Sequence, residues 1–266
     1  VAILSNGRSP KTWGIPILQV QDPRIALSYI SSQFYGSPSA KMNIIGVTGT
    51  NGKTSITHIL HHILQKSHIN CGTLGTLGFH APSGMISTGF TTPESIELQQ
   101  MLNTLLRAGV KDVVMEISSH ALNLHRVEDV DVNIAVFSNL TPEHLDFHGD
   151  MNSYFLAKRR LFDELPSDAR TIVNLDDPRG SLLASAASRP VTYAIDQPAD
   201  VVSEVVDSSF DGLVFNVRTS RGSLHLRSSL LGRINVYNIL AAVATAVALD
   251  LPFDAIEQGV ESLKSV

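Results

Sequence analysis

The sequence predicts an α/β fold in which a mostly parallel sheet is flanked by helices, with a small antiparallel extension near the C-terminus. Two observations lead to this fold class. Short runs rich in Val and Ile are apolar on both faces, as strands of a covered parallel sheet are, and helical stretches lie between them. Farther along the chain, strand follows strand without helices. The apolar runs are Ile44–Val47, Val110–Ile117, Val132–Phe137 and Thr171–Leu175.

The composition is that of a packed globular protein. The chain has 266 residues, 43% of them hydrophobic and 17% charged, which is too apolar for a disordered tail. Its net charge of −5 provides no basic field for nucleic acid, and no apolar run approaches the ~20 residues of a membrane span. The single cysteine, Cys71, excludes an internal disulfide. We therefore expect a cytoplasmic protein that binds no nucleic acid, enters no membrane and buries Cys71.

Residues 1–40 are expected to form a separate segment. Strands are predicted at Val1–Leu4 and Ile17–Val20, and a helix at Asp22–Phe34, where an N-capping Asp precedes a proline at the first helical position. The turn-rich stretch Tyr35–Ser39 predicts a domain boundary. Because the chain opens on an apolar strand without an initiator Met and stops just after an amphipathic helix, we expect a piece of a longer protein.

The remaining elements follow from the same patterns. The antiparallel extension is expected between Val191 and Leu230, and the Ala-rich apolar stretch after it has the composition of a buried helix. The extension would contain strands Val201–Val206, Leu213–Val217 and Leu224–Leu226. Helices are predicted at Lys53–Lys66, Pro93–Ala108, Met151–Glu164, Val236–Leu249 and Asp254–Leu263.

The strongest local signal is a glycine-rich turn between a buried strand and a helix, from Ile44 to Ser55. Its glycines let backbone N–H groups turn toward a polyphosphate, and the helix N-terminus adds partial positive charge. Lys53 can reach the terminal phosphates, and the Thr54 hydroxyl can ligate Mg²⁺. Val47 stands where the usual spacing, Gly-x₄-Gly-Lys-Ser/Thr, requires glycine, so the loop is a variant. The expected nucleotide contacts are Gly49, Thr50, Asn51, Gly52, Lys53, Thr54 and Ser55.

This loop indicates a fold like that of the P-loop NTPases, but by itself it does not separate an ATPase, a kinase, a GTP switch and a ligase. At Thr48–Thr54 the sequence also resembles the Mur ligases, ATP-dependent enzymes that add amino acids to the peptidoglycan precursor. Further motifs follow in order over residues 41–250 and look most like the tripeptide-forming branch of that family. They are Thr91–Pro93, Met115–His120, His125–Arg126, Ser138–Gly149, Ala157–Lys158, Asn235 and Asn238.

The resemblance implies a three-domain enzyme that forms an amide bond. Residues 1–40 would end the N-terminal domain that binds the UDP substrate, residues 41–266 would form the central ATP-binding domain, and the C-terminal ligase domain would be absent. With ATP and Mg²⁺, a carboxylate of UDP-MurNAc-L-Ala-D-Glu would become an acyl phosphate, which the amine of meso-diaminopimelate or L-lysine would attack. We expect a monomer, and a fragment that cannot complete the reaction alone.

The resemblance also assigns the catalytic residues. Lys53 would act on the phosphates, Glu116 and His144 would ligate Mg²⁺ beside Thr54, and Lys158 would be carbamylated by CO₂, which turns a cation into an anion with two oxygen ligands. Without the resemblance, Glu116 would be a solvated carboxylate at a strand end and His144 a hydrogen-bonding loop residue, since Mg²⁺ prefers oxygen. The basic run at Lys158 would be a solvated helix face.

Four further residues are implied in binding the sugar–peptide substrate. Thr92 also suits the cap of the following helix. Arg126 could fork onto a phosphate or carboxylate, or could pair with Glu128 or Asp129. The four residues are Thr91, Thr92, Ser118 and Arg126.

Two asparagines, Asn235 and Asn238, match residues that face the adenine base in the family. Asn235 could instead cap the helix Val236–Leu249. The chain departs from the family at Phe90, where Asn is common, and at Leu124, where Gln is common, which leaves the peptide contacts open.

Two alternatives stay open: the same fold with another acceptor, as in folylpolyglutamate synthase, or a nucleotide-binding module or GTP switch without ligase chemistry.

Three histidines, His58, His61 and His62, have a metal-like i, i+3, i+4 spacing. Helix geometry places them turns away from the phosphates, so we expect them at the surface.

Overall fold

The computed structural model of the chain describes residues 3–7, 14–81, 84–86 and 89–265. Its strands are β1 (Ile3–Ser5), β2 (Ile17–Gln19), β3 (Asn43–Thr48), β4 (Cys71–Gly75), β5 (Gly78–Ala81), β6 (Gly84–Ile86), β7 (Asp112–Glu116), β8 (Ile134–Phe137), β9 (Arg170–Asn174), β10 (Pro190–Ala194), β11 (Val201–Ser209), β12 (Gly212–Thr219) and β13 (Gly222–Ser228). Its α-helices are α1 (Pro23–Phe34), α2 (Lys53–Lys66), α3 (Ser95–Arg107), α4 (Ser119–Asn123), α5 (Leu145–His148), α6 (Met151–Asp163), α7 (Gly180–Ala186), α8 (Arg233–Ala248) and α9 (Phe253–Ser262).

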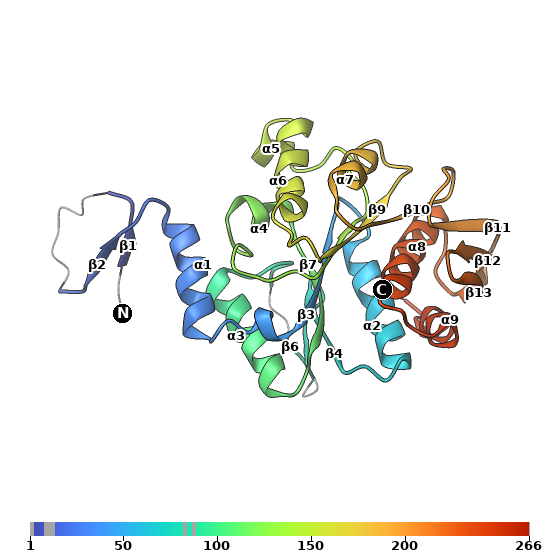
Figure 1. Cartoon of the computed structure of the whole chain (residues 1–266), viewed down its shortest axis with the longest axis horizontal. Helices are drawn as coiled ribbons and strands as arrows, with labels where there is room; N and C mark the ends of the chain where they lie inside the picture. Colours follow the sequence, from blue (N-terminus) through green and yellow to red (C-terminus); the bar gives the residue numbers. More distant parts are fainter. Residues whose placement is uncertain (1–2, 8–13, 82–83, 87–88, 266) are drawn as a thin grey trace.

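One sheet organises the part of the chain from β3 onward. Within the described residues it has eleven strands in the order β13-β12-β11-β10-β9-β8-β3-β7-β4-β5-β6, and helices cover both faces (Figure 1). All neighbouring pairs from β4 through β7, β3, β8, β9 and β10 to β11 are parallel. The predicted α/β fold with a mostly parallel sheet is therefore confirmed.

The antiparallel extension is smaller than predicted at its start. Among the described strands at that end of the sheet, the β11–β12 and β12–β13 pairs are antiparallel, whereas β10 runs parallel to β9 and to β11. At the other edge of the sheet, β4 pairs with β5 and β5 pairs with β6, both antiparallel, and this second antiparallel part was not predicted. These strands are short and rich in glycine, so they lack the Val and Ile pattern that identifies the others.

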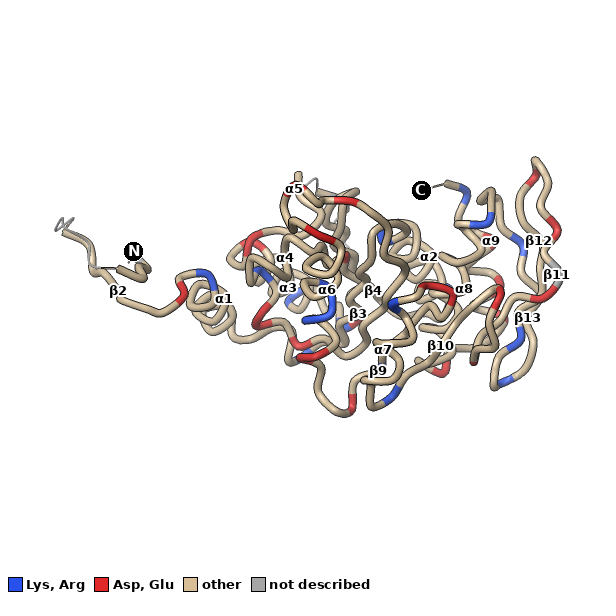
Figure 2. The backbone as a smooth tube through the Cα atoms, turned by 90° about the horizontal axis from the view of Figure 1, so that it is seen from above, with Lys and Arg blue, Asp and Glu red and all other residues tan. Residues whose placement is uncertain are grey.

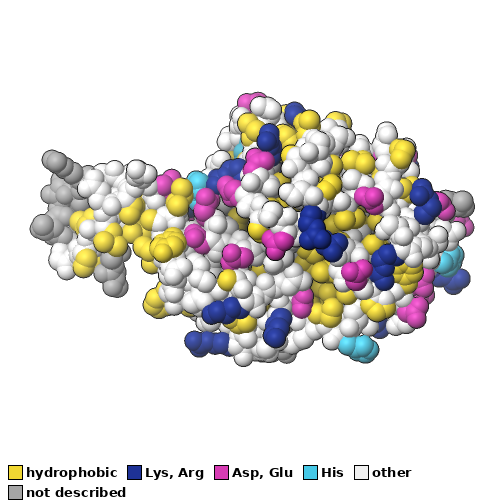
Figure 3. All heavy atoms as spheres, viewed as in Figure 1, with side chains coloured by type: hydrophobic (Ala, Val, Ile, Leu, Met, Phe, Trp, Pro, Cys, Tyr) yellow, Lys and Arg dark blue, Asp and Glu magenta, His cyan; other side chains and the backbone are white. Residues whose placement is uncertain are grey.

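The N-terminal segment projects from one end of the molecule (Figure 1). The strands β1 and β2 pair in parallel, and residues 1–2 of the first predicted strand lie outside the described residues. The start of α1 is as predicted, because an Asp22 carboxylate oxygen accepts from the amides of Arg24 and Ile25 at 2.7 and 3.2 Å. Hydrophobic side chains gather over this projecting part (Figure 3). Phe34, the last residue of α1, is 80% exposed.

The core lies on both faces of the parallel strands. On one face α2, α8 and α9 pack together, and on the other face α3, α4 and α6 cover β3 and β7. Adjacent residues of β3 divide between the two layers, with Ile45 and Val47 on the α2 side and Ile44 on the other. This arrangement explains why the central strands are apolar on both faces. The helix α8 is buried along most of its length, as its composition predicts.

Charged residues of both signs are spread over the described backbone (Figure 2). Short runs of one sign occur, such as Lys158-Arg159-Arg160 on α6. No helix among the described residues is long and apolar enough to cross a bilayer. Cys71 is buried as predicted, and burial raises the pKa of its thiol to about 12.

The expectation of a surface histidine cluster is wrong for its central member. His61 is only 5% exposed, and its ring lies 5.0 Å from the ring of His80 on β5. His62 bonds to Ser262 of α9 through its Nδ1 atom at 2.8 Å. The cause is that α2 is covered both by the sheet and by α9, so no full face of this helix points to solvent.

Lowering the pH from 7 toward 4 is expected to destabilise the protein through His61. Burial, aided by the charges of His80, His62 and His58, lowers the pKa of His61 from 6.5 to about 4. Between pH 6.5 and about 4 the unfolded chain binds more protons than the folded one. The contribution of neutral His61 to the free energy of unfolding is therefore complete above pH 6.5, and it is lost as the pH falls from 6.5 toward 4. It amounts to roughly 3 kcal/mol.

The measurement is the free energy of urea unfolding at pH 7 and pH 5. His61→Phe should show a weaker pH dependence than wild type, while His225→Gln, at an exposed site, should not change it. An equal pH dependence in wild type and His61→Phe would contradict this assignment.

Candidate active site

The phosphate loop connects β3 to α2 and requires glycine at two positions. Gly49 and Gly52 have φ values of 147° and 90°. A Cβ atom on Gly49 would lie 1.9 Å from the Ser138 hydroxyl, and one on Gly52 would lie 2.2 Å from Oδ1 of Asn238. Backbone conformation and close packing therefore both exclude larger residues. The helix begins at Lys53, as predicted.

The loop is held by the segment that follows β8. The amides of Thr50 and Asn51 donate to the backbone and side-chain oxygens of Asn139 at 2.8 and 3.0 Å. The Ser138 hydroxyl donates to the Asn51 carbonyl at 2.6 Å, and Thr50 Oγ1 exchanges bonds with the backbone of Thr141. These two loop amides are therefore already paired with Asn139. The first amides of α2 have no partner within the helix, so they are the donors that could bind an anion.

Sequence reasoning did not assign a role to Ser138, Asn139 or Thr141. The signal was present, because these polar residues follow a buried strand, and parallel neighbours β3 and β8 end at the same edge of the sheet.

Two lysines converge on the same carbonyl of the loop. Lys53 Nζ donates to the carbonyls of Gly49 and Thr50 at 2.9 and 2.8 Å, and Lys158 Nζ donates to Gly49 at 2.8 Å. Lys158 is 1% exposed and lies 4.6 Å from the centre of the Tyr154 ring. Burial lowers the pKa of both lysines, and for Lys158 the nearby charge of Lys53 lowers it further, well below its usual range.

The interpretation of Lys158 as part of a solvated face is therefore wrong. The run divides by helical period: Lys158 faces inward, whereas Arg159 pairs with Asp163 at 3.0 Å on the exposed side of α6. The tyrosine on the inner side, Tyr154, contacts the loop directly, with its hydroxyl 3.2 Å from Thr50 Oγ1.

Glu116 ends β7 and is buried, at 1% exposed, so its interpretation as a solvated strand-end carboxylate is also wrong. Its Oε2 atom accepts from the hydroxyls of Thr54 and Thr76 at 3.0 and 3.1 Å, and its Oε1 atom accepts from the Thr76 amide at 2.9 Å. Burial raises the pKa of Glu116, and these hydrogen bonds together with Lys53 oppose that rise.

The Thr54 hydroxyl and the Glu116 carboxylate form an oxygen donor set of the kind that Mg²⁺ prefers, so these residues fit a magnesium ion. His144 is placed differently. It adopts the left-handed conformation (φ 56°), its side chain is 44% exposed, and its ring lies 4.8 Å from that of His120. Among the described residues, no hydrogen bond or ion pair joins His144 to Glu116 or Thr54, and no group of three or more His, Cys, Asp or Glu is arranged to hold a metal.

The residues expected at the substrate lie directly beside Glu116. Thr92 Oγ1 donates to the Glu116 carbonyl at 2.9 Å and accepts from the Ser118 amide at 3.1 Å. Thr91 Oγ1 lies 3.0 Å from Thr76 Oγ1. The predicted nucleotide and substrate residues thus meet at the end of β7.

Two of the alternatives for these residues are wrong. Thr92 does not cap the next helix, because α3 begins at Ser95 with Glu94 at the cap position. Arg126 pairs with Glu94 at 2.7 Å and donates to the Thr92 carbonyl at 3.1 Å. Glu128 pairs instead with His125 and Arg160. The Ser118 hydroxyl accepts from the Ala121 amide and caps α4.

The two asparagines lie in the first turns of α8. The helix begins at Arg233 with Gly232 as its N-cap, so Asn235 does not cap it. Asn235 donates to the Leu231 carbonyl at 2.8 Å and accepts from Nδ2 of Asn238 at 3.0 Å. Asn238 is 3% exposed and packs against Gly52, which links α8 to the phosphate loop.

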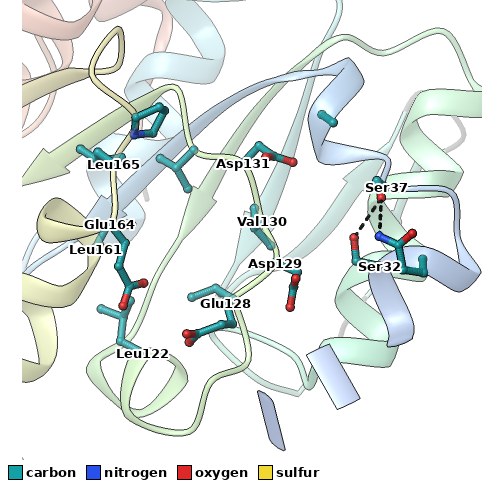
Figure 4. Close-up of a pocket in the computed structure, with 15 residues that line it drawn as sticks. Ser32, Ser37, Leu122, Glu128, Asp129, Val130, Asp131, Leu161, Glu164 and Leu165 are labelled. Atoms are coloured by element: carbon teal, nitrogen blue, oxygen red, sulfur yellow. Dashed lines mark hydrogen bonds between the residues drawn. The ribbon is translucent and has the colours of Figure 1, made fainter. Parts of the chain in front are cut away.

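The cavity in Figure 4 lies elsewhere. Its volume is about 520 Å³, and Glu128, Asp129 and Asp131 line it together with the ends of α1 and α6. It borders the chain that enters β8, at the amino edge of the parallel strands, whereas the phosphate loop follows their carboxyl edge. The cavity and the candidate site therefore lie at opposite ends of the parallel strands.

Fold and site define the class as an α/β protein with a P-loop nucleotide site, with a buried carboxylate and a buried lysine beside the loop. Residues 47–246 match the family model of the Mur ligase middle domain. The chain belongs to the Mur ligase family.

Individual relatives agree with this assignment. The UDP-N-acetylmuramoyl-L-alanyl-D-glutamate–2,6-diaminopimelate ligase of Geobacter metallireducens is 42% identical over 98% of this chain and 52% of its own length. The chain spans about half the length of the curated relatives it matches. A solved structure of a ligase with the same name matches all of this chain and 55% of its own, with a TM-score of 0.87 and 30% identity.

The fold is shared more widely. Mycobacterium tuberculosis folylpolyglutamate synthase, solved with ADP and AMPPCP, matches 92% of this chain and 64% of its own with a TM-score of 0.75. Its 17% identity shows a common fold alone.

Proposed function

We propose that the chain is the ATP-binding part of a ligase that joins an amino acid to UDP-MurNAc-L-Ala-D-Glu through an acyl phosphate. The observation that carries this proposal is the position of Glu116. Its carboxylate bonds to Thr54 of the phosphate loop, and its carbonyl bonds to Thr92 among the expected substrate residues. The name of the 42% identical relative favours meso-diaminopimelate over L-lysine as the amino acid.

The proposed reaction has two steps. A carboxylate oxygen of the substrate attacks the γ-phosphorus of ATP, and ADP leaves. The amine nitrogen of the amino acid then attacks the acyl carbon, the bond from that carbon to the phosphate oxygen breaks, and inorganic phosphate leaves as the amide forms. Water must be excluded, because it would compete with the amine for the acyl phosphate.

The residues of this chain divide the work. The first amides of α2 and Lys53 bind the phosphates and offset their charge, and Asn235 and Asn238 face the adenine base. Thr54 and Glu116 would hold Mg²⁺, which neutralises charge on the transferring phosphoryl group when bound. We place Thr91, Thr92, Ser118 and Arg126 at the sugar–peptide substrate.

We further propose that Lys158 is carbamylated and that His144 joins the metal site when substrates bind. Burial favours the uncharged amine of Lys158, and only an uncharged amine can add to CO₂. Carbamylation would also place a negative charge beside Lys53, so that the two side chains form an ion pair.

The family match over 47–246 supports residues 41–266 as the ATP-binding domain, and we propose residues 1–40 as the end of the UDP-binding domain. Since ATP is the proposed energy source, we place the reaction in the cytoplasm. Ligation is tested with the full-length gene product, because the relatives are about twice as long as this chain.

The test is amide formation from UDP-MurNAc-L-Ala-D-Glu, meso-diaminopimelate and ATP with Mg²⁺. We expect phosphate release only when both other substrates are present. Phosphate release that ignores both would contradict the proposal, and protection against heating by a folate rather than by the UDP-sugar peptide would favour a different acceptor.

Arg126→Lys is expected to raise the KM for the UDP substrate about 10-fold while kcat changes little. Lysine keeps the charge but loses the planar fork that bonds Glu94 and the Thr92 carbonyl together. Losing one charged hydrogen bond costs about 1.5 kcal/mol, which corresponds to that factor. Steady-state kinetics measure it, with Arg159→Lys on the exposed side of α6 as the control, and an unchanged KM would remove Arg126 from the substrate site.

A further inference from the structure

Thr76 occupies a position between the two halves of the site and has no role in the proposal above. It lies in the turn between β4 and β5. Its amide donates to Oε1 of Glu116 at 2.9 Å, and its hydroxyl donates to Oε2 at 3.1 Å. The same hydroxyl oxygen is 3.0 Å from the hydroxyl oxygen of Thr91. One side chain therefore touches both the expected metal ligand and an expected substrate residue.

The direction of these bonds follows from the number of protons. An ionised carboxylate can only accept, so the single proton of the Thr76 hydroxyl is donated to Glu116. The Thr76 oxygen can then only accept from Thr91, and the Thr91 hydroxyl must be the donor. The result is a directed chain from Thr91 through Thr76 to Glu116, in which each bond polarises the next.

The fold fixes this turn at the site. Because β4 runs parallel to β7, both strands end at the same edge of the sheet. Gly75 allows the turn to approach, since a Cβ atom there would lie 2.2 Å from Oε1 of Glu116. Thr76 is nevertheless an exposed residue, whereas Glu116 is buried, so the chain leads from the accessible surface to the buried carboxylate.

We infer that Thr76 is a positioning residue that couples binding of the UDP substrate at Thr91 to binding of Mg²⁺ and ATP at Glu116. The inference rests on the proposed function. If the Thr91 hydroxyl donates to a substrate oxygen instead, Thr76 loses the hydrogen bond that it accepts from Thr91. A cation bound at Glu116 would compete for the carboxylate oxygen that accepts from Thr76. Each ligand thus changes the bond on which the other depends, which makes the coupling reciprocal.

The experiment measures the affinity of the full-length gene product for AMPPCP with Mg²⁺ by titration calorimetry, with and without saturating UDP-MurNAc-L-Ala-D-Glu. Coupling is the ratio of the two affinities. Thr76→Val keeps the shape and removes only the hydroxyl, and Thr76→Ser keeps the hydroxyl. Thr104→Val is the matched control, because the Thr104 hydroxyl donates to the Gln100 carbonyl on the exposed face of α3.

We expect a coupling of about 10-fold in wild type, in Thr76→Ser and in Thr104→Val, and a ratio near unity in Thr76→Val. A role confined to folding would lower both affinities and leave their ratio unchanged. A wild-type ratio of unity, or an unchanged ratio in Thr76→Val, would overturn the inference while wild-type amide formation still supports the proposed function. Absence of amide formation by wild type would overturn both.

Discussion

Lys158→Met is expected to lower the kcat for amide formation by about 10³-fold, the upper range for removing one group that stabilises transferring charge. Methionine approximates the volume of lysine, so it fills the space beside Tyr154, but it can neither donate to the Gly49 carbonyl nor carry a carbamate. The neighbouring Lys53 already bonds to the carbonyls of Gly49 and Thr50, so it is not free to take over the position of Lys158.

Wild type and the variant are compared by steady-state kinetics and by thermal unfolding. Protein prepared with ¹³C-bicarbonate should show a carbamate carbon resonance that Lys158→Met lacks. Arg159→Met is the control, because the adjacent residue is on the outer side of α6. A Lys158→Met protein with the wild-type kcat would contradict a catalytic role for Lys158.

Gly52→Ala is expected to weaken nucleotide binding by about 100-fold. Two costs combine: alanine is strained at a φ of 90°, and its Cβ would meet Oδ1 of Asn238 at 2.2 Å. Backbone strain of this kind costs about 1–3 kcal/mol, and relief of the contact must move either the loop or the start of α8. Both elements are expected at the nucleotide, so affinity falls more than stability.

Calorimetric titration with ADP measures this effect. Gly109→Ala is the matched control, because Gly109 also has a positive φ, of 77°, but no atom lies within 4 Å of the added Cβ. It should lose stability and keep nucleotide affinity. Equal affinities of Gly52→Ala and wild type would contradict the placement of the loop.

Much of the fold follows from local patterns. The bounds of α2 are those predicted, and β3 and β8 lie within two residues of the predicted runs. The two strands could be recognised because a covered sheet requires short runs that are apolar on both faces. The strand order is not local. It places the β4 turn beside β7, and the role inferred for Thr76 depends on that neighbourhood.

Burial of charged groups was the main error of interpretation. Glu116 and Lys158 look like ordinary surface residues in the sequence, since a carboxylate or ammonium usually stays in water. Their burial depends on partners that are distant in the chain: Thr76 and Thr54 for the carboxylate, and the Gly49 carbonyl for the lysine. Only the family resemblance pointed to both residues before the structure did.

The central claim is that this site makes an acyl phosphate, and the fate of the substrate oxygen tests it most directly. The full-length gene product is given UDP-MurNAc-L-Ala-D-Glu labelled with ¹⁸O in the reacting carboxylate, together with ATP, Mg²⁺ and meso-diaminopimelate. Each amide formed should transfer a labelled oxygen to inorganic phosphate, because the bond that breaks in the second step joins the acyl carbon to that oxygen. Amide formation with the label in AMP, or with unlabelled phosphate, would contradict the account.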